Sequence, residues 1–141
     1  MTNEKVPEPI KIELPDELYS FLEENGIENV IVAVFLTVIG PVLRFYVRET
    51  SFTQKIIESP ELLGDISIIG KYAKIAKIRN GPIIYLRDFR VDGKYLLIIF
   101  EVKRISSTVE KILDIFIKKI IEKKDISPIL IIDVLHELVK L

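Results

Sequence analysis

The sequence predicts an α/β (α+β) fold, namely a five-stranded, mostly antiparallel sheet flanked by helices, with an additional C-terminal helix. Two β-branched, apolar segments, residues 30–39 and 42–47, indicate a buried first hairpin. Asn80-Gly81 and Asp92-Gly93 each separate extended segments, as is typical of hairpin turns. Residues 107–124 carry apolar side chains at helical spacing. Together these patterns indicate a layered sheet-and-helix domain.

The composition bounds the architecture and the class of partner. The chain has 141 residues, of which 49% are hydrophobic and 29% charged, so we expect one domain over residues 1–141. Its 20 basic and 21 acidic side chains give a net charge of −1, and no overall field attracts nucleic acid or an anionic membrane. The absence of cysteine excludes disulfides and thiolate chemistry. Abundant Ile and Lys, with no Trp, fit a thermophile.

The N-terminal region indicates a cytoplasmic protein without a membrane span. Residues 1–9 are charged and contain proline, unlike a signal peptide. The longest uncharged run, residues 30–43, is shorter than the roughly 20 residues that a spanning helix needs. We therefore expect a cytoplasmic location and no transmembrane segment.

The first elements are a loose lead-in and a short helix. Within residues 1–13, apolar and polar residues alternate only over a short stretch around Ile10 and Ile12, which could add at most an edge strand. Pro15 suits the first position of a helix, and Asn25-Gly26 supplies its end. The core of the domain is expected over residues 14–124.

The first hairpin is expected to turn at Gly40-Pro41. The nearly continuous apolar run from Asn29 predicts a strand with helices on both of its faces. In the returning strand, Arg44, Tyr46 and Arg48 alternate with apolar residues, which predicts one buried and one wetter face.

The middle of the chain is expected to be helical but irregular. Ser51 and Gln54 have the spacing of a capping box, and Pro60 interrupts the helix that follows. Residues 61–77 keep helical spacing around two glycines, so we expect a broken or kinked helix there. A strand over residues 77–79 should then enter the Asn80-Gly81 turn.

The C-terminal third is predicted to hold a central strand and two helices. Residues 95–102 are apolar enough for a central strand, and Ser107 with Glu110 forms a second capping-box spacing. A final helix begins at Ser127-Pro128. Its inward stripe is formed by Ile131, Val134, Leu135 and Leu138. Four further apolar residues suggest a partner interface on this helix: Ile129, Leu130, Ile132 and Val139.

No cluster of residues dictates a reaction, so we expect no catalytic, cofactor-binding or metal-ligating residues and no cofactor. His136 is the single histidine, and its charged neighbours favour a solvated helix face. Asp88 and Asp92 flank a hairpin that turn chemistry explains without a cation. The glycines stand apart and make no phosphate-binding loop.

A basic patch gives an alternative hypothesis of nucleic-acid or anionic-surface binding. It would interleave cations with tyrosines that stack on bases. Its members are Lys71, Lys74, Lys77, Arg79, Arg87, Arg90 and Lys94, with Tyr72, Tyr85 and Tyr95. Near-neutral net charge favours the simpler interpretation that these residues are solubilising.

The order of elements resembles the roadblock and longin superfamily. The resemblance covers about residues 25–124 and rests on the first hairpin and on the ending DGKYLLIIFEVKRISSTVEKILDIF, from Asp92 to Phe116. It implies a five-stranded antiparallel sheet wrapped by helices, no catalytic residues, dimerisation, and docking of Ras-like small GTPases or trafficking and motor complexes. The irregular middle helix and the helix after Ser127 depart from the family. A profilin-like sensor domain is similar in layout.

The leading hypothesis is therefore a non-enzymatic scaffold or regulatory domain. It would form a dimer and dock a protein partner, with a small Ras-like GTPase or a trafficking complex as the expected class. The alternatives are a binder of nucleic acid or anionic surfaces and a profilin-like sensor.

Overall fold

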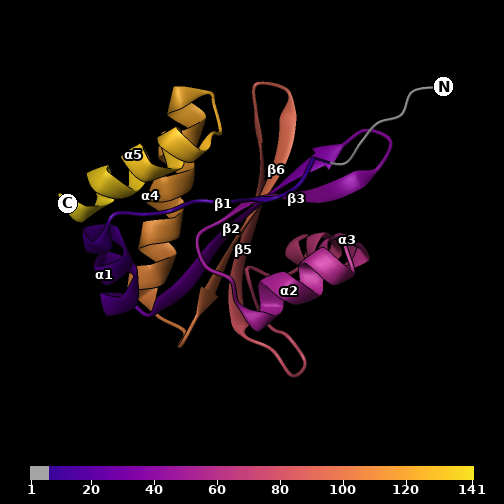
Figure 1. Cartoon of the computed structure of the whole chain (residues 1–141), viewed down its shortest axis with the longest axis horizontal. Coiled ribbons are helices and arrows are strands. Elements are labelled where there is room, and N and C mark those ends of the chain that lie inside the picture. Colours follow the sequence, from indigo (N-terminus) through magenta and orange to yellow (C-terminus); the bar gives the residue numbers. More distant parts are fainter. Residues whose placement is uncertain (1–6) are drawn as a thin grey trace.

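The computed structural model describes residues 7–141 as one mixed sheet between two helical layers (Figure 1). The strands are β1 (Ile10–Lys11), β2 (Ile27–Leu36), β3 (Gly40–Tyr46), β4 (Ile75–Lys77), β5 (Ile83–Val91) and β6 (Lys94–Val102). The helices are α1 (Asp16–Glu24), α2 (Ser51–Glu58), α3 (Glu61–Gly70), α4 (Ser107–Lys123) and α5 (Pro128–Val139). The α+β class predicted from the sequence is confirmed.

Over residues 7–141 the sheet has six strands in the order β1-β3-β2-β6-β5-β4, one more than predicted. All neighbouring pairs are antiparallel except β1 and β3, which run parallel through Ile10 opposite Phe45 and Lys11 opposite Tyr46. The five strands of the predicted, mostly antiparallel sheet correspond to β2–β6, which pair antiparallel throughout. Pro9 directly precedes β1 and has no N–H to donate to a ladder, which fits a strand of only two residues. Residues 1–6 of the predicted lead-in lie outside the described residues.

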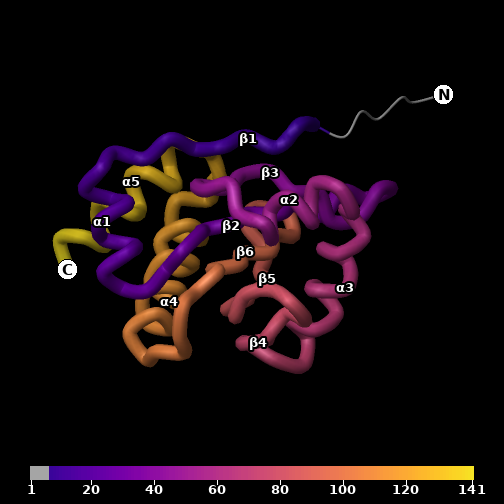
Figure 2. The backbone as a smooth tube through the Cα atoms, turned by 60° about the horizontal axis from the view of Figure 1, so that its bottom comes forward, coloured from indigo at the N-terminus to yellow at the C-terminus, as the bar shows by residue number. Residues whose placement is uncertain are grey.

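Two cores lie on the two faces of the sheet. Helices α1, α4 and α5 cover one face, whereas α2 and α3 cover the other (Figures 1 and 2). The larger core contains Phe100 and Phe116, and the smaller contains Phe52 and Ile99. Strands β2 and β6 are buried on both faces, as their nearly continuous apolar sequences predict.

The first hairpin turns before Gly40-Pro41. Residues 37–39 form the turn, and Gly40, at φ +93°, already pairs with Leu36 as the first residue of β3. A β-bulge at Arg44, where the register shifts between Val32 and Ala33, places Tyr46 among the buried residues of the α2–α3 face. The wetter face predicted for this strand is therefore wrong at Tyr46.

The middle segment is two helices and a strand. Thr50, and not Ser51, caps α2: its Oγ1 accepts from the backbone N–H of Thr53, whose hydroxyl accepts from the N–H of Thr50. Pro60 separates α2 from α3, as expected, but α3 ends at Gly70, so the helical spacing predicted up to residue 77 is wrong beyond that point.

The strand expected at residues 77–79 lies two residues earlier. β4 covers Ile75–Lys77 because the loop beyond it is longer than a two-residue turn and is closed by a hydrogen bond from the Ile78 N–H to the Pro82 carbonyl oxygen.

The last two helices follow the predicted periodicity. Ser106, one residue before the predicted cap, accepts from the Thr108 N–H at the start of α4. Ser127 caps α5 through the Leu130 N–H, with Pro128 in the first turn. The four residues of α5 predicted to point inward are all buried. Helix α5 packs on α4 and α1, so it completes the larger core.

Candidate functional site

A buried polar cluster joins β2, β6 and the start of α2. Glu101 is 2% exposed, and its Oε2 accepts hydrogen bonds from Asn29 Nδ2 and Thr50 Oγ1, each at 2.7 Å. Asn29 and Glu101 are opposite one another across β2 and β6. The cluster therefore fixes the first turn of α2 to the centre of the sheet.

Asn29 also holds the chain that leaves β3. Its Oδ1 accepts from the backbone N–H groups of Val30, Val47 and Arg48, and its Nδ2 donates to the Arg48 carbonyl oxygen at 2.9 Å. Both polar atoms of this buried amide are satisfied by hydrogen bonds within the fold, so its role is structural. The loop from Val47 to Thr50 is consequently held by side-chain bonds as well as by the sheet.

Burial raises the pKa of the Glu101 carboxyl above its ordinary value. Loss of solvent around the charged form is the largest cause, and the negative charge of Glu28 acts in the same direction. The hydrogen bonds from Thr50 and Asn29 oppose this rise. Glu101 is thus a buried acid that keeps its proton to a higher pH than an exposed glutamate does.

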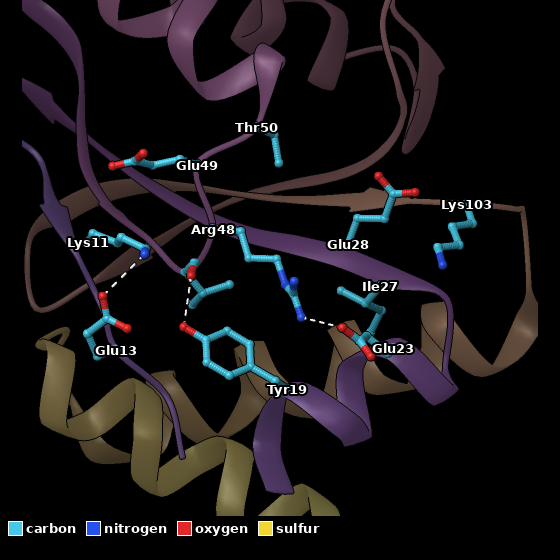
Figure 3. Close-up of a pocket in the computed structure, with 11 residues that line it drawn as sticks. Lys11, Glu13, Tyr19, Glu23, Ile27, Glu28, Arg48, Glu49, Thr50 and Lys103 are labelled. Atoms are coloured by element: carbon cyan, nitrogen blue, oxygen red, sulfur yellow. Dashed lines mark hydrogen bonds and ion pairs between the residues drawn. The ribbon is translucent and has the colours of Figure 1, made fainter. Parts of the chain in front are cut away.

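A cleft of about 760 Å³ adjoins this cluster, and we call it the charged cleft (Figure 3). It lies between the α1 region and the segment that connects β3 to α2. Its lining residues are Lys11, Glu13, Tyr19, Glu23, Ile27, Glu28, Val47, Arg48, Glu49, Thr50 and Lys103. Thr50 links the cleft to Glu101.

Arg48 is the central cation of the charged cleft. Its Nη2 lies 2.6 Å from Glu23 Oε1, and its guanidinium carbon lies 4.8 Å from the centre of the Tyr19 ring (Figure 3). Tyr19 in turn donates through its hydroxyl to the Val47 carbonyl oxygen at 3.2 Å. Arg48 and Tyr19 therefore tie α1 to the end of β3, an arrangement that orders the cleft wall.

The remaining charges of the charged cleft are mixed. Lys11 pairs with Glu13 at 3.2 Å, and this hydrogen bond is the first cause of the raised pKa of Lys11. Lys103 lines the cleft without an ion-pair partner among residues 7–141. With cations and carboxylates interspersed, the cleft suits a polar ligand but defines no single charge class.

Two side chains that were weighed for chemistry and set aside, His136 and Asp88, make contacts within the fold. His136 Nδ1 lies 3.0 Å from Glu17 Oε1, which joins α5 to α1. Asp88 accepts a hydrogen bond from the Tyr95 hydroxyl, and this bond is the main cause of the raised pKa of Tyr95. Over residues 7–141, no group of three or more acidic or histidine side chains is placed to hold a metal ion. None of the described helices has the length and apolarity needed to cross a bilayer.

The structure does not gather the basic patch on one face. Arg87 lies against α4, 3.7 Å from Glu110 and 3.6 Å from Asp114, whereas Arg90 stacks over Tyr95. Tyr85 is buried, with its hydroxyl bonded to the backbone of Ser106. Six of the seven cations are exposed, namely Lys71, Lys74, Lys77, Arg79, Arg90 and Lys94.

The four predicted interface residues of α5 divide into two pairs. Ile129 is 73% exposed and Val139 39% exposed. Leu130 and Ile132 are partly buried and pack against the larger core. Partner contact through this helix stays a prediction, with Ile129 as its most accessible residue.

Helix α3 presents a second apolar surface, which the sequence did not single out. Its polar residues Glu61, Asp65 and Ser67 share one side of the helix, and Ile68 is the apolar residue among them. Beyond the buried Leu63 and Ile66, it leaves apolar side chains in solvent. The α3 patch consists of Ile68, at 56% exposed, Ile69, at 38%, and Tyr72, at 87%, which follows the end of the helix.

Comparison with known proteins gives no assignment: no family model, no curated protein and no solved structure matches this chain. The candidate sites rest on their own geometry.

Sequence reasoning missed the charged cleft and the buried cluster. The residues that line the cleft, such as Lys11, Arg48 and Lys103, come from three separate segments, so no local sequence pattern predicts it. The cluster did leave a signal, because Asn29 and Glu101 are polar residues inside otherwise apolar strands.

Proposed function

We propose that this chain is a non-enzymatic scaffold of roadblock or longin type that dimerises and docks a protein partner. The observation that carries the proposal is the α3 patch, because large apolar side chains gathered at the surface usually mark an interface. Helix α3 lies with α2 on one face of the sheet, where it forms part of the molecular surface (Figure 1). A partner that covers Ile68, Ile69 and Tyr72 would remove this apolar surface from water.

The neighbouring sheet edge supports the same proposal. Strand β4 pairs with β5 only at Ile83, Ile84 and Tyr85. Beyond the hydrogen bond from the Leu86 N–H to the Lys74 carbonyl oxygen, no described strand covers the outer edge of residues 87–91. Unpaired edges are templates for strand addition by another chain. Gly70, at the end of α3, lies against Leu86 of β5, so that end of the helix is next to the start of this edge.

The dimer is tested by light scattering coupled to size exclusion over a concentration series. We expect a dimer that Ile68→Asp converts to monomer, because a carboxylate would be buried in the interface. Ile121→Asp is the matched control, since Ile121 is also exposed but lies on α4. Ile129→Asp tests the surface predicted on α5. A wild-type monomer up to high micromolar concentration would remove dimerisation from the proposal.

Docking of a small Ras-like GTPase is the partner class that the resemblance implies. We expect the immobilised chain to retain such a GTPase from its own source organism, with a preference between the GDP form and the GTP-analogue form. Equal retention of both forms, or none, would argue against GTPase docking while leaving the dimer standing.

The nucleic-acid alternative now rests on the six exposed cations. It predicts binding that weakens steeply with salt and is reduced by Lys74→Glu. Arg87→Glu should mainly disturb α4, because Arg87 faces Glu110 and Asp114.

A further inference from the structure

A half-open apolar groove of about 540 Å³ lies where the start of β3 meets α2 and α3. We call it the apolar groove. Its lining residues are Pro7, Pro9, Ile39, Pro41, Val42, Leu43, Ile56, Ile57, Pro60, Glu61, Leu63 and Gly64. The volume falls within the range of about 300–1,000 Å³ that is usual for small-molecule sites.

The walls of the apolar groove keep it open. Four of its residues are prolines, whose rings fix the backbone. Gly64 contributes no side chain, and a Cβ placed there would meet no atom within 4 Å. Leu63 and Ile56, at the groove floor, are buried in the smaller core and cannot swing out to fill the space. The groove is thus a built hollow.

The apolar groove has one charge at its margin. Glu61 is the sole charged residue that lines it, and within residues 7–141 Glu61 has no ion-pair partner. Glu61 is also exposed, so its carboxylate is accessible from solvent. An apolar hollow with a lone carboxylate complements a ligand that has a hydrocarbon body and a cationic end.

The walls also bear on the shape of the ligand. Pro7 and Pro9 form one side of the groove, and neither has an N–H to donate to an added strand. On the outer edge of β3, the positions of Phe45 and Tyr46 are already taken by β1. The groove residues of β3, from 41 to 43, have no strand on this edge within residues 7–141, but Pro41 has no N–H either. We therefore favour a small molecule over an added peptide strand as the ligand.

We propose that the apolar groove binds a small aliphatic ammonium compound, with its hydrocarbon chain between Pro41, Ile57 and Gly64 and its cation at Glu61. This site is separate from the proposed dimer surface: it uses the start of α3, whereas the α3 patch lies at the end of that helix.

The test uses octylammonium and octanoate as probes, which share a chain length and differ in charge. Binding is followed by amide chemical shifts of the full-length protein. Octylammonium should shift amides of the groove and bind about two- to fivefold more tightly than octanoate, a preference expected from an exposed ion pair. Glu61→Gln should abolish the preference for octylammonium over octanoate, while both probes still bind through their hydrocarbon chains.

Gly64→Leu should fill the groove and reduce octylammonium binding by at least about tenfold without unfolding the chain, since position 64 is open. Asp65→Leu is the control, because it adds the same side chain one residue away at a position that does not line the groove. Three results would overturn the proposal: no shifts at the groove, equal binding of octanoate, or full binding by a folded Gly64→Leu variant. None of them bears on the dimer.

Discussion

Glu101 is the side chain whose proton the fold controls most directly. It is buried beneath the first turn of α2, and both of its observed hydrogen bonds reach the same oxygen. Because its pKa is raised in the folded state, the folded chain holds this proton more tightly than the unfolded chain. Folding stability is therefore fullest below the unfolded pKa and is lost as pH rises toward the folded pKa.

Glu101→Gln should remove this loss. The amide oxygen of glutamine can accept the hydrogen bonds from Thr50 and Asn29 without a charge to desolvate. We expect equal unfolding free energies for the two proteins near pH 4 and a more stable variant at pH 7–8, measured by urea denaturation across pH. Glu24→Gln, at the exposed end of α1, controls for the change in net charge. Parallel pH profiles for wild type and Glu101→Gln would contradict the assignment.

For single residues, the sequence indicated which positions are unusual but not which residues they contact. Asn29 and Glu101 stand out as polar residues in apolar strands, yet only the register of β2 and β6 brings them opposite one another. Arg48 was assigned to a strand face, and nothing near it in sequence pointed to Tyr19 or Glu23. Such contacts join segments that are distant in the chain, so local patterns cannot specify them.

At the start of α2, the two adjacent hydroxyl residues Thr50 and Ser51 have different roles. Thr50 Oγ1 accepts from the Thr53 N–H at 3.1 Å and donates to Glu101, whereas Ser51 is exposed in the first turn. Thr50→Val should lower the unfolding free energy by about 1–2 kcal/mol, and Ser51→Ala by less than about 0.5 kcal/mol, in chemical denaturation. The opposite ranking would restore Ser51 as the cap.

Two glycines of α3 should respond differently to alanine. Gly64 faces open space, so Gly64→Ala should raise the unfolding free energy by about 0.5–1 kcal/mol through helix propensity. At Gly70 a Cβ would lie 2.9 Å from Leu86 Cδ1, and Leu86 is buried, so Gly70→Ala should give no gain or a loss. Thermal unfolding of both variants checks this contrast, and equal gains would show that Leu86 yields freely.

Helices and turns were predicted best where their signals are local. The spacing of α4 and α5 and the Asp92-Gly93 turn between β5 and β6 needed no distant partner. The errors fell on features that neighbouring strands decide. The bulge at Arg44 arises in the pairing of β3 with β2. The position of β4 is set by its pairing with Ile83, Ile84 and Tyr85 of β5. Caps were misplaced by one residue because adjacent Ser and Thr residues offer the same hydroxyl.

For the whole molecule, the predicted sheet of five antiparallel strands between helical layers was correct in kind, and β1 was added by an edge pairing that the prolines keep short. Helix α5 was predicted as an addition to the core of residues 14–124, with one stripe of apolar residues pointing inward. It places Ile131, Val134 and Leu135 in the interior between α4 and α1. The helix is therefore an integral part of the larger core.

A chain that ends at Lys124 should consequently fail to fold. Burial of the four inward apolar side chains of α5 contributes about 6–12 kcal/mol by transfer free energy, and a domain is stable by only about 5–15 kcal/mol. We expect the truncated chain to lose cooperative thermal unfolding in circular dichroism and dispersion in its amide spectrum. Ile129→Ser, on the exposed side of the same helix, should change stability by less than about 0.5 kcal/mol. A truncated chain that still unfolds cooperatively would show that α1, α4 and the sheet form a sufficient core, and α5 would then be free to serve as an interface.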